Sequence, residues 1–461
     1  MCVVMSDALP SSIPGPELQR RVTLLVQQGH ANEALDLVDR VVAAAPARVD
    51  AQLLRGDVLA LNRRYDDALQ AYRQARTLDP SNVRALSSEG SALMRLQLVE
   101  AATKVFDAAL ALATHVPGTW YNRGLALAGQ NRVKEALADF NKAIEITGDY
   151  ALAHINRAML LLLTGRYREG FTEFEWRFGV EPGSRELRSY REPRWRKGNS
   201  IAGKRVLLYA EQGMGDVIQF ARFIPEVAAS AAHVTLEVHP PLVRLLQTLP
   251  CDVVPLGAQA TPFNLHSPLV SLGTLLDVQL ETVPAQVPYL AAVEADIARW
   301  RGKLAGLQGK LKVGIAWSGN PEHNNDVNRS VPFAALAPLL GVPDIAFVNL
   351  QKDVRESERD AVTASPLFDA GRELGDFADT AGLIANLDLV IAADTAVAHL
   401  AGALGKPVWI LLPFAPDWRW MLERSDSAWY PTARLFRQTA IGAWRRAIED
   451  VRRELVSLLT A

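Results

Sequence analysis

The sequence predicts a protein of the α + α/β class, in which a helical repeat region precedes two α/β lobes. Two observations support this fold class. Over the first third of the chain, small and aromatic residues recur every 34 residues, whereas beyond residue 200 short apolar runs alternate with helical patterns. Helical repeats stack into solenoids, and strands that alternate with helices favour parallel sheets. The length of 461 residues fits this division, because domains average roughly 150 residues.

Several residue series share the period of the helical repeat. They are the glycines Gly56, Gly90 and Gly124, the alanines Ala34, Ala68, Ala102 and Ala136, and the aromatic residues Tyr72, Phe106, Phe140 and Phe174. Small side chains allow two helices to approach closely, and the aromatic ring is expected to fill the space between repeats. A 34-residue period with this pattern resembles the tetratricopeptide repeat. We therefore expect an N-terminal α-solenoid over residues 1–180, with about five units.

The two end units of this solenoid match the pattern poorly. In the last unit, Gly170 replaces the periodic alanine and Arg177 replaces a small residue. Weak end units are typical of caps, because an end repeat has a single neighbour to bury against. Such a stack usually presents a concave groove that binds a peptide or protein. A dimerisation surface and a rigid spacer are the alternatives.

Residues 181–200 interrupt the repeat with two prolines, two glycines and six Lys/Arg, a composition typical of a connector. Its charge suits phosphate, although exposed basic segments are more commonly only solvated. Beyond it we expect a first lobe over 201–294, an inter-lobe linker over 295–309 and a second lobe over 310–461. The predicted strands are 204–210, 234–238, 312–317, 345–350, 387–392 and 408–412. Ligands of open α/β sheets usually bind at the carboxyl ends of such strands.

The first predicted strand ends in a glycine-rich loop, Glu211–Gln219. Gly213 and Gly215 permit a tight turn and close approach of a ligand to the backbone. Ile218 stands where a dinucleotide fingerprint has its third glycine, and no P-loop lysine follows. Asp216 is placed either to cap a helix or to act as a general base toward a hydroxyl in the cleft.

A polar loop follows the strand at 312–317 and contains Ser318, Asn320, Arg329 and Ser330. Hydroxyl and amide groups of this kind suit sugar or phosphate oxygens, and the guanidinium of Arg329 can fork onto a diphosphate. An ordinary polar turn is the alternative for this loop.

The strand at 387–392 runs into Asp394 and Thr395, and a helix is predicted over 396–404. The free N–H groups at the start of such a helix form an anion site, to which Thr395 adds a hydroxyl. Asp394 is placed to hold ribose hydroxyls or to orient the loop. His399 lies one turn further on, where a phosphate contact and a buried structural histidine are equally compatible with the pattern.

Aromatic residues and three arginines follow the next strand, over 413–420 and 427–438. Aromatic faces with arginine forks suit a sugar or a base. We interpret most of these residues as lobe packing and ion pairs.

Composition and motifs exclude several classes of protein. The formal net charge of −2, from 49 Lys+Arg and 51 Asp+Glu, provides no global basic field for nucleic acid. Two cysteines exclude a disulfide framework and a four-cysteine zinc site, and neither Asp-x-Asp nor His-Glu-x-x-His occurs, so we expect no metal site. No apolar run reaches the roughly 18 residues of a membrane-spanning helix, and the N-terminus lacks a signal-peptide pattern, so we expect a cytoplasmic protein without an integral membrane segment.

Five motifs occur in order behind the repeats: EQGMGDVIQFARF, GIAWSGNPEHNNDVNRSVP, VIAADTAVAHLAGALGKPVW, PFAPDWRW and WYPTARLFRQ. In this combination the chain resembles bacterial glycosyltransferases fused to tetratricopeptide repeats. Their catalytic half is similar to the ADP-heptose–lipopolysaccharide heptosyltransferases of glycosyltransferase family 9. The resemblance implies a GT-B pair of Rossmann-like lobes and inverting, metal-independent transfer from a nucleotide-diphosphate sugar to a protein or glycan hydroxyl. No cofactor is then needed besides this donor substrate.

The resemblance also implies residue roles. Asp216 matches the catalytic base, and Arg329 matches the basic residue at the donor phosphates, where heptosyltransferases tend to carry lysine. The positions implied in donor binding are Gly213, Gly215, Gln219, Ser318, Asn320, Ser330, Gln351, Asp394, Thr395, Ala396 and His399. Ala396 replaces a family glycine and leaves less room for a phosphate, so a nucleotide sugar other than ADP-heptose is an open alternative.

Two other functions stay open at the level of sequence. One is a non-enzymatic repeat scaffold whose α/β half is a degenerate glycosyltransferase, because a fold does not guarantee its chemistry. The other is a nucleotide-sugar epimerase, which can share the two-lobed architecture but needs no acceptor groove.

Overall fold

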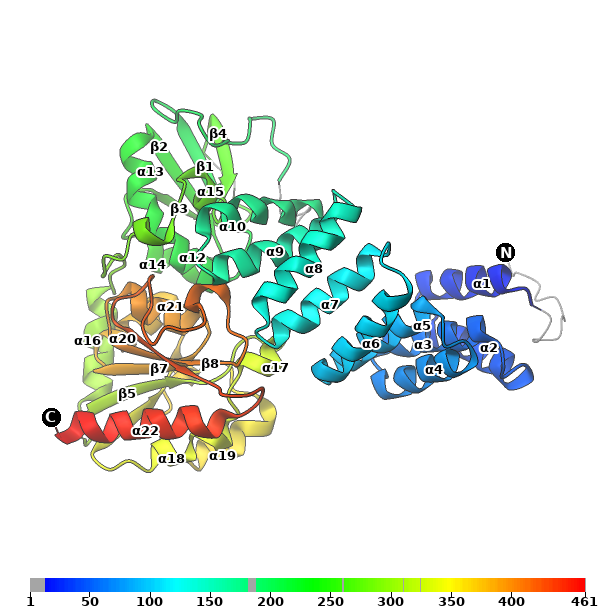
Figure 1. The fold of residues 1–461 in the computed structure, drawn as a ribbon. Helices are drawn as coiled ribbons and strands as arrows, with labels where there is room; N and C mark the ends of the chain where they lie inside the picture. The colour runs from blue at the N-terminus through cyan, green and yellow to red at the C-terminus, as the bar shows by residue number, and fades with distance from the viewer. Residues whose placement is uncertain (1–12, 181–187, 259–260, 310, 324, 461) are drawn as a thin grey trace. The chain divides into compact units, whose positions relative to one another are not determined.

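The computed structural model describes residues 13–180, 188–258, 261–309, 311–323 and 325–460 (Figure 1). The chain forms two compact units, residues 1–157 and 158–461. The first consists of helices, and the second combines helices with two parallel sheets.

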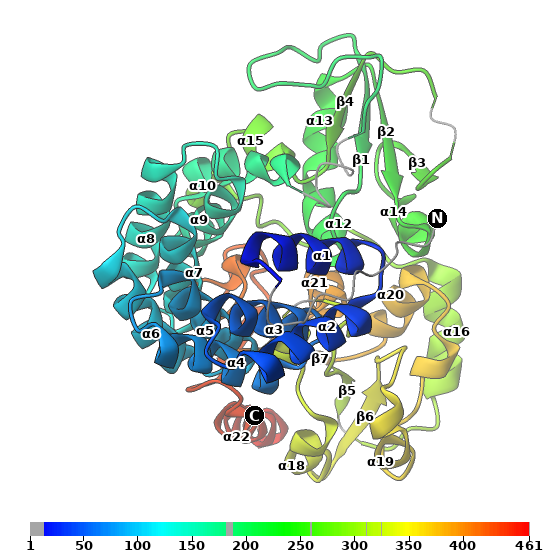
Figure 2. The ribbon, with the colours of Figure 1, turned by 90° about the vertical axis from the view of Figure 1, so that its right-hand side faces the viewer.

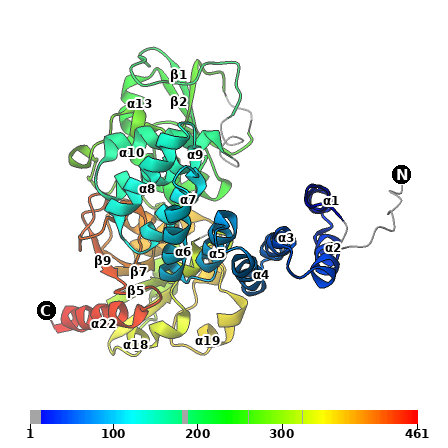
Figure 3. The same cartoon turned by 45° about the vertical axis from the view of Figure 1, so that its right-hand side comes forward.

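The first unit is a series of antiparallel helix pairs, in which α3 packs on α4, α5 on α6 and α7 on α8 (Figure 3). Consecutive pairs stack through contacts of α4 with α5 and of α6 with α7. The helices are α1 (Gly15–Gln27), α2 (Ala31–Ala44), α3 (Val49–Leu61), α4 (Tyr65–Leu78), α5 (Val83–Arg95), α6 (Val99–Leu112), α7 (Pro117–Gly129) and α8 (Val133–Ile146). The helix α9 (Ala151–Leu163) contains the boundary between the units.

The periodic residues hold each helix pair together. A Cβ added at Gly90 in α5 would lie 2.5 Å from the ring of Phe106 in α6, and that ring is fully buried. Gly124 and Phe140 make the same contact between α7 and α8, with a corresponding distance of 2.7 Å. The glycine thus makes room for the aromatic ring of its own pair, which is a tighter relation than the inter-repeat packing expected from the period.

The second unit begins inside the last helix pair. Tyr167 and Phe171 of α10 (Tyr167–Phe174) are buried, and the ring of Phe171 occupies the space where Gly273 lacks a side chain. The ring of Tyr167 stacks on Trp429 at 5.7 Å between centroids, and Trp429 donates a hydrogen bond to its hydroxyl. For this reason the compact units separate at 157/158, whereas the repeat period places the end of the solenoid at residue 180.

Both sheets of the second unit are entirely parallel (Figure 2). The first has the order β3-β2-β1-β4 and the second the order β6-β5-β7-β8-β9. The strands of the first sheet are β1 (Arg205–Tyr209), β2 (His233–Val238), β3 (Asp252–Pro255) and β4 (Leu265–Pro268). Those of the second are β5 (Leu311–Ala316), β6 (Ile345–Asn349), β7 (Leu389–Ala393), β8 (Val408–Leu412) and β9 (Ala433–Arg437).

Helices connect these strands, as the alternating pattern predicted. Those around the first sheet are α12 (Met214–Phe220), α13 (Ile224–Ser230), α14 (Val243–Leu246) and α15 (Leu272–Leu275). The remaining helices are α16 (Glu294–Leu304), α17 (Asp326–Arg329), α18 (Ala337–Leu340), α19 (Arg359–Thr363), α20 (Phe377–Ala385), α21 (Ala396–Ala403) and α22 (Trp444–Thr460). The expected linker at 295–309 is therefore mostly the helix α16, which buries Trp300 and Leu304 and packs on α20.

Two arginines in the described part of the basic connector form ion pairs. Arg188 pairs with the buried Glu237 of β2, and Arg194 pairs with Glu175. Residues 181–187 lie outside the described residues. The expectation that these charges are only solvated is therefore wrong for Arg188 and Arg194, because each has a carboxylate partner.

Candidate active site

The strand order creates a crevice in each sheet at which ligands of α/β proteins bind. In the second sheet, β6 lies on one side of β5, and the next strand, β7, lies on the other side. The switch point is therefore between β5 and β7. In the first sheet the corresponding point lies between β1 and β4. Ligands bind outside the carboxyl ends of the strands at such points. The predicted site residues follow β1, β5, β6 and β7, which places them at these edges.

The protein's own side chains fill the crevice of the first sheet. Glu211, directly after β1, accepts hydrogen bonds from the N–H groups of Leu269 and Val270 after β4, at 3.0 and 3.2 Å. Arg177 donates to the same carboxylate at 2.9 Å. Burial raises the pKa of Glu211 to about 7, and the charge of Arg177 opposes this rise. The crevice of the second sheet is therefore the better candidate for a ligand.

Two predicted site residues hold the loop after β5 in shape. The side-chain oxygen of Gln351 accepts from the N–H groups of Trp317 and Ser318, at 3.2 and 3.1 Å. The hydroxyl of Ser330 accepts from the N–H of Gly319 at 3.1 Å. Ser318 differs from them, because its buried hydroxyl has no hydrogen-bond partner in the described part of the chain.

Arg329 reaches from this loop to the end of β7. Its Nη1 donates to the carbonyl of Asp394 at 3.3 Å, and its guanidinium covers Gly319, where an added Cβ would lie 2.5 Å from Nη2. Its buried Nε forms an ion pair with the carboxylate of Asp326 at 3.7 Å, which is longer than a hydrogen bond. Asn320, in contrast, caps its own turn by accepting from the N–H of Glu322 at 3.0 Å.

The end of β7 brings Asp394 and Thr395 to the same crevice. Thr395 directly precedes α21, and its hydroxyl is buried without a partner within the described residues. Burial, together with the charge of Asp417, raises the pKa of Asp394 to about 6, whereas Arg419 and Arg329 oppose this rise. A helix N-terminus, an unpartnered hydroxyl and a guanidinium therefore meet at this edge of the sheet.

The first turn of α21 meets α12 of the other lobe. A Cβ added at Gly215 would lie 2.9 Å from Cδ2 of His399 and 3.5 Å from Cα of Ala396, so glycine permits this close contact. His399 shares a hydrogen bond of 2.9 Å with the hydroxyl of Tyr430. Burial, together with the charge of Arg419, holds the pKa of His399 well below its usual value. His399 is therefore a neutral, buried group in this structure.

Asp216 faces the second lobe and is directly paired with Arg419. The guanidinium of Arg419 also donates to the side chain of Gln219 and, at 2.8 Å, to Asp417. Gln219 is fully buried, whereas the side chain of Asp216 keeps 23% of its surface exposed. Gly213 starts this turn, where an added Cβ would lie 3.3 Å from the carboxylate of Asp216. Asp216 thus remains partly exposed, although Arg419 occupies one of its oxygens.

The structure brings the predicted residues into two connected groups. Across the lobes, Gly215 meets Ala396 and His399, whereas Asp216 and Gln219 meet Arg419. Within the second lobe, Arg329 meets Asp394. Arg419 connects the groups, and sequence reasoning missed it as a site residue. The signal for it is the motif of arginines and aromatic residues after β8, which predicts lobe packing and ion pairs, and Arg419 indeed forms ion pairs with Asp216 and Asp417.

Two absences hold for the part of the chain that the structure describes. No cluster of three or more His, Cys, Asp or Glu side chains is arranged to hold a metal ion. No helix there combines the length and apolar character needed to cross a membrane.

Comparison with known proteins assigns the first unit. Models of the tetratricopeptide repeat match residues 20–83, 62–117 and 117–150. The N-terminal helices are therefore tetratricopeptide repeats, and such repeats bind protein partners.

Individual relatives cover different shares of the chain. Protein FlbA of Caulobacter vibrioides is 28% identical over 414 residues, which are 83% of this chain and 68% of FlbA. The human protein O-mannosyl-transferase TMTC3 is 26% identical over 167 residues, which are 36% of this chain but 16% of TMTC3. The structure of TTC0263, a repeat protein of Thermus thermophilus, covers 38% of this chain and 95% of its own at 18% identity, with a TM-score of 0.34.

Proposed function

We propose that the protein is an inverting glycosyltransferase with a GT-B pair of lobes. It would transfer a sugar from a nucleotide-diphosphate sugar to a hydroxyl of a protein or glycan that the repeats bind. One observation carries the proposal most directly. At the switch point of the second sheet, the hydroxyls of Ser318 and Thr395 are buried without hydrogen-bond partners among the described residues. Buried polar groups are almost always satisfied, so unpartnered ones at a ligand-binding edge favour a polar ligand.

The chemistry of this edge suits the diphosphate and the sugar of a donor. The N–H groups at the start of α21 and the guanidinium of Arg329 bind phosphate oxygens. The carboxyl group of Asp394 is suited to sugar hydroxyls. In the reaction these donors would stabilise the charge that develops on the leaving diphosphate, and one such donor is typically worth about 3 kcal/mol. The cationic side chains would perform this role without a metal ion, and no cofactor is required besides the donor.

The catalytic base in this proposal is Asp216 of α12, the helix that meets the first turn of α21. Its carboxylate takes the proton of the acceptor hydroxyl, the hydroxyl oxygen attacks the anomeric carbon, and the bond from that carbon to the diphosphate breaks on the opposite face. In this structure the guanidinium of Arg419 is paired with one oxygen of this carboxylate. We therefore propose that the incoming diphosphate takes over Arg419 and releases Asp216 for proton transfer.

A panel of UDP, GDP, ADP, CMP and dTDP sugars tests the donor site by thermal shift. We expect one nucleotide to raise the melting temperature of the full chain, since a ligand that binds only the folded state stabilises it. The stabilising nucleotide sugar is then tested for transfer to a hydroxyl acceptor. If every sugar nucleotide fails at about 1 mM, which corresponds to a binding free energy near −4 kcal/mol, the donor site is refuted.

A non-enzymatic scaffold is the second candidate function. The pairing of Asp216 with Arg419 favours it, because one oxygen of the proposed base is already bound by a guanidinium in this structure. The scaffold requires partner binding by the repeats and no turnover of any sugar nucleotide. Release of free sugar or nucleoside diphosphate from a bound donor would refute it.

A further inference from the structure

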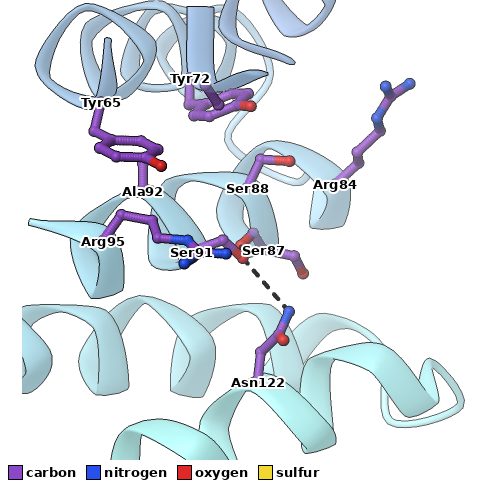
Figure 4. A pocket seen from close by; sticks show the side chains of 10 residues that line it. Tyr65, Tyr72, Arg84, Ser87, Ser88, Ser91, Ala92, Arg95 and Asn122 are labelled. Carbon is purple, nitrogen blue, oxygen red and sulfur yellow. Dashed lines mark hydrogen bonds between the residues drawn. The ribbon is translucent and has the colours of Figure 1, made fainter. Parts of the chain in front are cut away.

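Polar side chains of the repeat unit bond across neighbouring helix pairs. In the pocket of about 340 Å³ that Figure 4 shows, Asn122 of α7 donates to the hydroxyl of Ser91 of α5 at 3.5 Å. Arg123 of α7 donates to Asp107 of α6 at 2.7 Å, across 16 positions of the chain. Arg177, directly after α10, instead has partners in the loops after β1 and β4 of the first sheet. The last helix pair is thus bonded to the α/β unit by a buried cation.

The guanidinium of Arg177 joins three segments of the chain. Its Nη2 donates to Glu211 and to the hydroxyl of Ser271, at 2.9 Å each. Its Nη1 donates to Glu175 at 2.8 Å, and the hydroxyl of Ser271 donates to the same carboxylate at 2.8 Å. The ring of Phe178 covers the guanidinium, with 4.0 Å between its Cζ and the ring centroid. The planar donor set of an arginine fixes the directions of its partners, so this buried group holds the three segments in one arrangement.

The carboxylate of Glu211 extends this network to the start of the turn between β1 and α12. It is buried, and besides the bond from Arg177 it accepts from the N–H groups of Leu269 and Val270 at 3.0 and 3.2 Å. Removing one partner of a buried ion pair leaves an uncompensated charge, which is strongly unfavourable. Loss of Arg177 would therefore drive the carboxylate of Glu211, and the backbone that carries it, toward water.

The turn that Glu211 begins leads directly to Asp216, the proposed base. His239 donates to the carbonyl of Gln212 at 2.8 Å, which anchors the turn one residue after Glu211. Asp216 lies in the first turn of α12, so its place depends on how the chain enters this short helix. Burial raises the pKa of Glu211, and the charge of Asp216 adds to this rise, so the two carboxylates are close enough to interact. A shift of Glu211 is therefore passed on to Asp216.

We propose that Arg177 and Glu211 are positioning residues for the base of the proposed reaction. Arg177 holds Glu211, and Glu211 holds the turn that presents the carboxylate of Asp216 to the acceptor hydroxyl. The end of the last helix pair is then a part of the catalytic site as well as the end of the solenoid. The inference rests on the proposed function for the role of Asp216, whereas the ordering of the turn by Arg177 is measured without any donor.

Hydrogen exchange of the full chain, followed by mass spectrometry, tests the ordering of the turn. In Arg177→Gln the N–H groups of residues 212–218 should exchange about tenfold faster than in the wild type, as the loss of a charge-assisted hydrogen bond predicts. Arg177→Lys keeps the charge but not the fork, so it should show a smaller increase, and it serves as the test if Arg177→Gln does not fold.

Arg188→Gln is the matched control. It removes the arginine partner of Glu237, which is likewise a buried carboxylate of the first sheet, and it should leave the exchange of residues 212–218 unchanged. A kinetic measurement adds the role in catalysis. With a donor identified by the nucleotide-sugar panel, Arg177→Gln should lower kcat for transfer about tenfold and leave the KM of the donor unchanged, because the base is displaced and the donor site is not.

Three outcomes would overturn the proposal. The first is unchanged exchange of residues 212–218 in the Arg177 variants. The second is equal acceleration in Arg188→Gln, or throughout the first sheet, which would mean that the pair only stabilises the lobe. The third is a raised KM of the donor with an unchanged kcat, which would assign the pair to the donor site. If no donor in the panel binds, the proposed function fails and the role of Asp216 fails with it, whereas the exchange data still decide whether Arg177 orders the turn.

Discussion

At the scale of single residues, the proposed chemistry depends on the ion pair between Asp216 and Arg419. Arg419 is almost fully buried and is shared by the carboxylates of Asp216 and Asp417. A diphosphate carries more negative charge than a carboxylate and offers oxygens in a geometry that matches a guanidinium. Donor binding and release of the base are therefore two consequences of a single exchange of partners.

A double-mutant cycle tests this exchange. Asp216→Asn should abolish transfer but bind the nucleoside diphosphate a few-fold more tightly than the wild type, because Arg419 loses a competing partner. Arg419→Gln should bind it about tenfold more weakly, since a charge-assisted bond is lost. Calorimetric titration of the single and double variants gives the coupling between the two residues.

The double variant provides the control for this cycle. If Asp216 affects affinity through Arg419, Asp216→Asn should change nothing in the Arg419→Gln background. An equal gain of affinity in both backgrounds would indicate simple repulsion between Asp216 and the ligand, and the proposed exchange would then be rejected.

Glu211 makes the stability of the second unit depend on pH. Its pKa is raised from 4.5 to about 7 in the folded chain. Between these values the unfolded chain releases a proton that the folded chain retains, so the free energy of unfolding falls as the pH rises through this window. Glu211 should contribute a fall on the order of 1–3 kcal/mol, and this contribution should be absent from Glu211→Gln. Urea unfolding at a series of pH values measures the difference.

Asp394 contributes a smaller fall in the same direction, because its pKa is raised from 3.8 to about 6. The comparison of wild type with Glu211→Gln isolates the contribution of Glu211, since both chains retain Asp394. Identical pH profiles for the two chains would contradict the assignment.

Sequence reasoning found the site residues that follow strands but not those that depend on distant partners. Asp216, Arg329 and Asp394 were predicted because each belongs to a loop at a strand end. Arg419 contacts Asp216 across 203 positions of the chain, and no local pattern encodes such a contact. Arg177 was noticed as a break in the repeat pattern, but its partner Glu211 becomes evident from the fold.

At the scale of elements, the helix pairs of the repeat depend on contacts between a glycine and an aromatic ring. Gly90→Ala would place a methyl group 2.5 Å from the buried ring of Phe106. Overpacking of this kind costs about 1–3 kcal/mol, and the higher helix propensity of alanine recovers at most about 1 kcal/mol. We expect a net loss of stability in the repeat unit, measured by thermal unfolding.

Gly118→Ala is the matched control for this prediction. It lies in the first turn of α7, and a Cβ there would have no atom within 4 Å. It should leave stability unchanged or slightly raised. An equal loss in both variants would show that the ring contact is not the cause.

The strands of the α/β unit were predictable where they carry an apolar run. β1, β2 and β5 to β8 coincide with predicted strands, because their apolar runs are buried on both faces of parallel sheets. β3 is largely exposed, and β4 reads Leu-His-Ser-Pro, so neither carries an apolar run. The linker was expected from its polar composition, whereas its helix is fixed by Trp300 and by packing on α20.

At the scale of the whole molecule, α10 decides where the chain can be divided. A fragment of residues 151–461 keeps the burial of Tyr167 and Phe171, whereas residues 181–461 would expose Gly273, Trp429 and the unpaired Glu211. Loss of a buried aromatic residue costs about 3–5 kcal/mol. We expect the longer fragment to unfold cooperatively and the shorter one to aggregate or to lack a cooperative transition, as calorimetry can show.

The longer fragment also separates the two halves of the proposed function. Without residues 1–150 it should bind and slowly hydrolyse the donor as the full chain does, but transfer to a macromolecular acceptor should fall at least tenfold. Hydrolysis and transfer are followed by release of the nucleoside diphosphate, with and without acceptor. An equal loss of both activities would mean that the repeats have a purely structural role.

The burial of α10 also determines the order in which a newly synthesised chain completes its fold. The partner of Tyr167 is Trp429, which lies 262 positions downstream. Phe171 forms its contact with Thr274, which lies 103 positions downstream. At a synthesis rate of 5–20 residues per second, Tyr167 stays without that partner for roughly 13–50 seconds. The apolar side of α10 is therefore accessible to a chaperone during this interval, and the last helix pair is finished only when nearly the whole chain has been made.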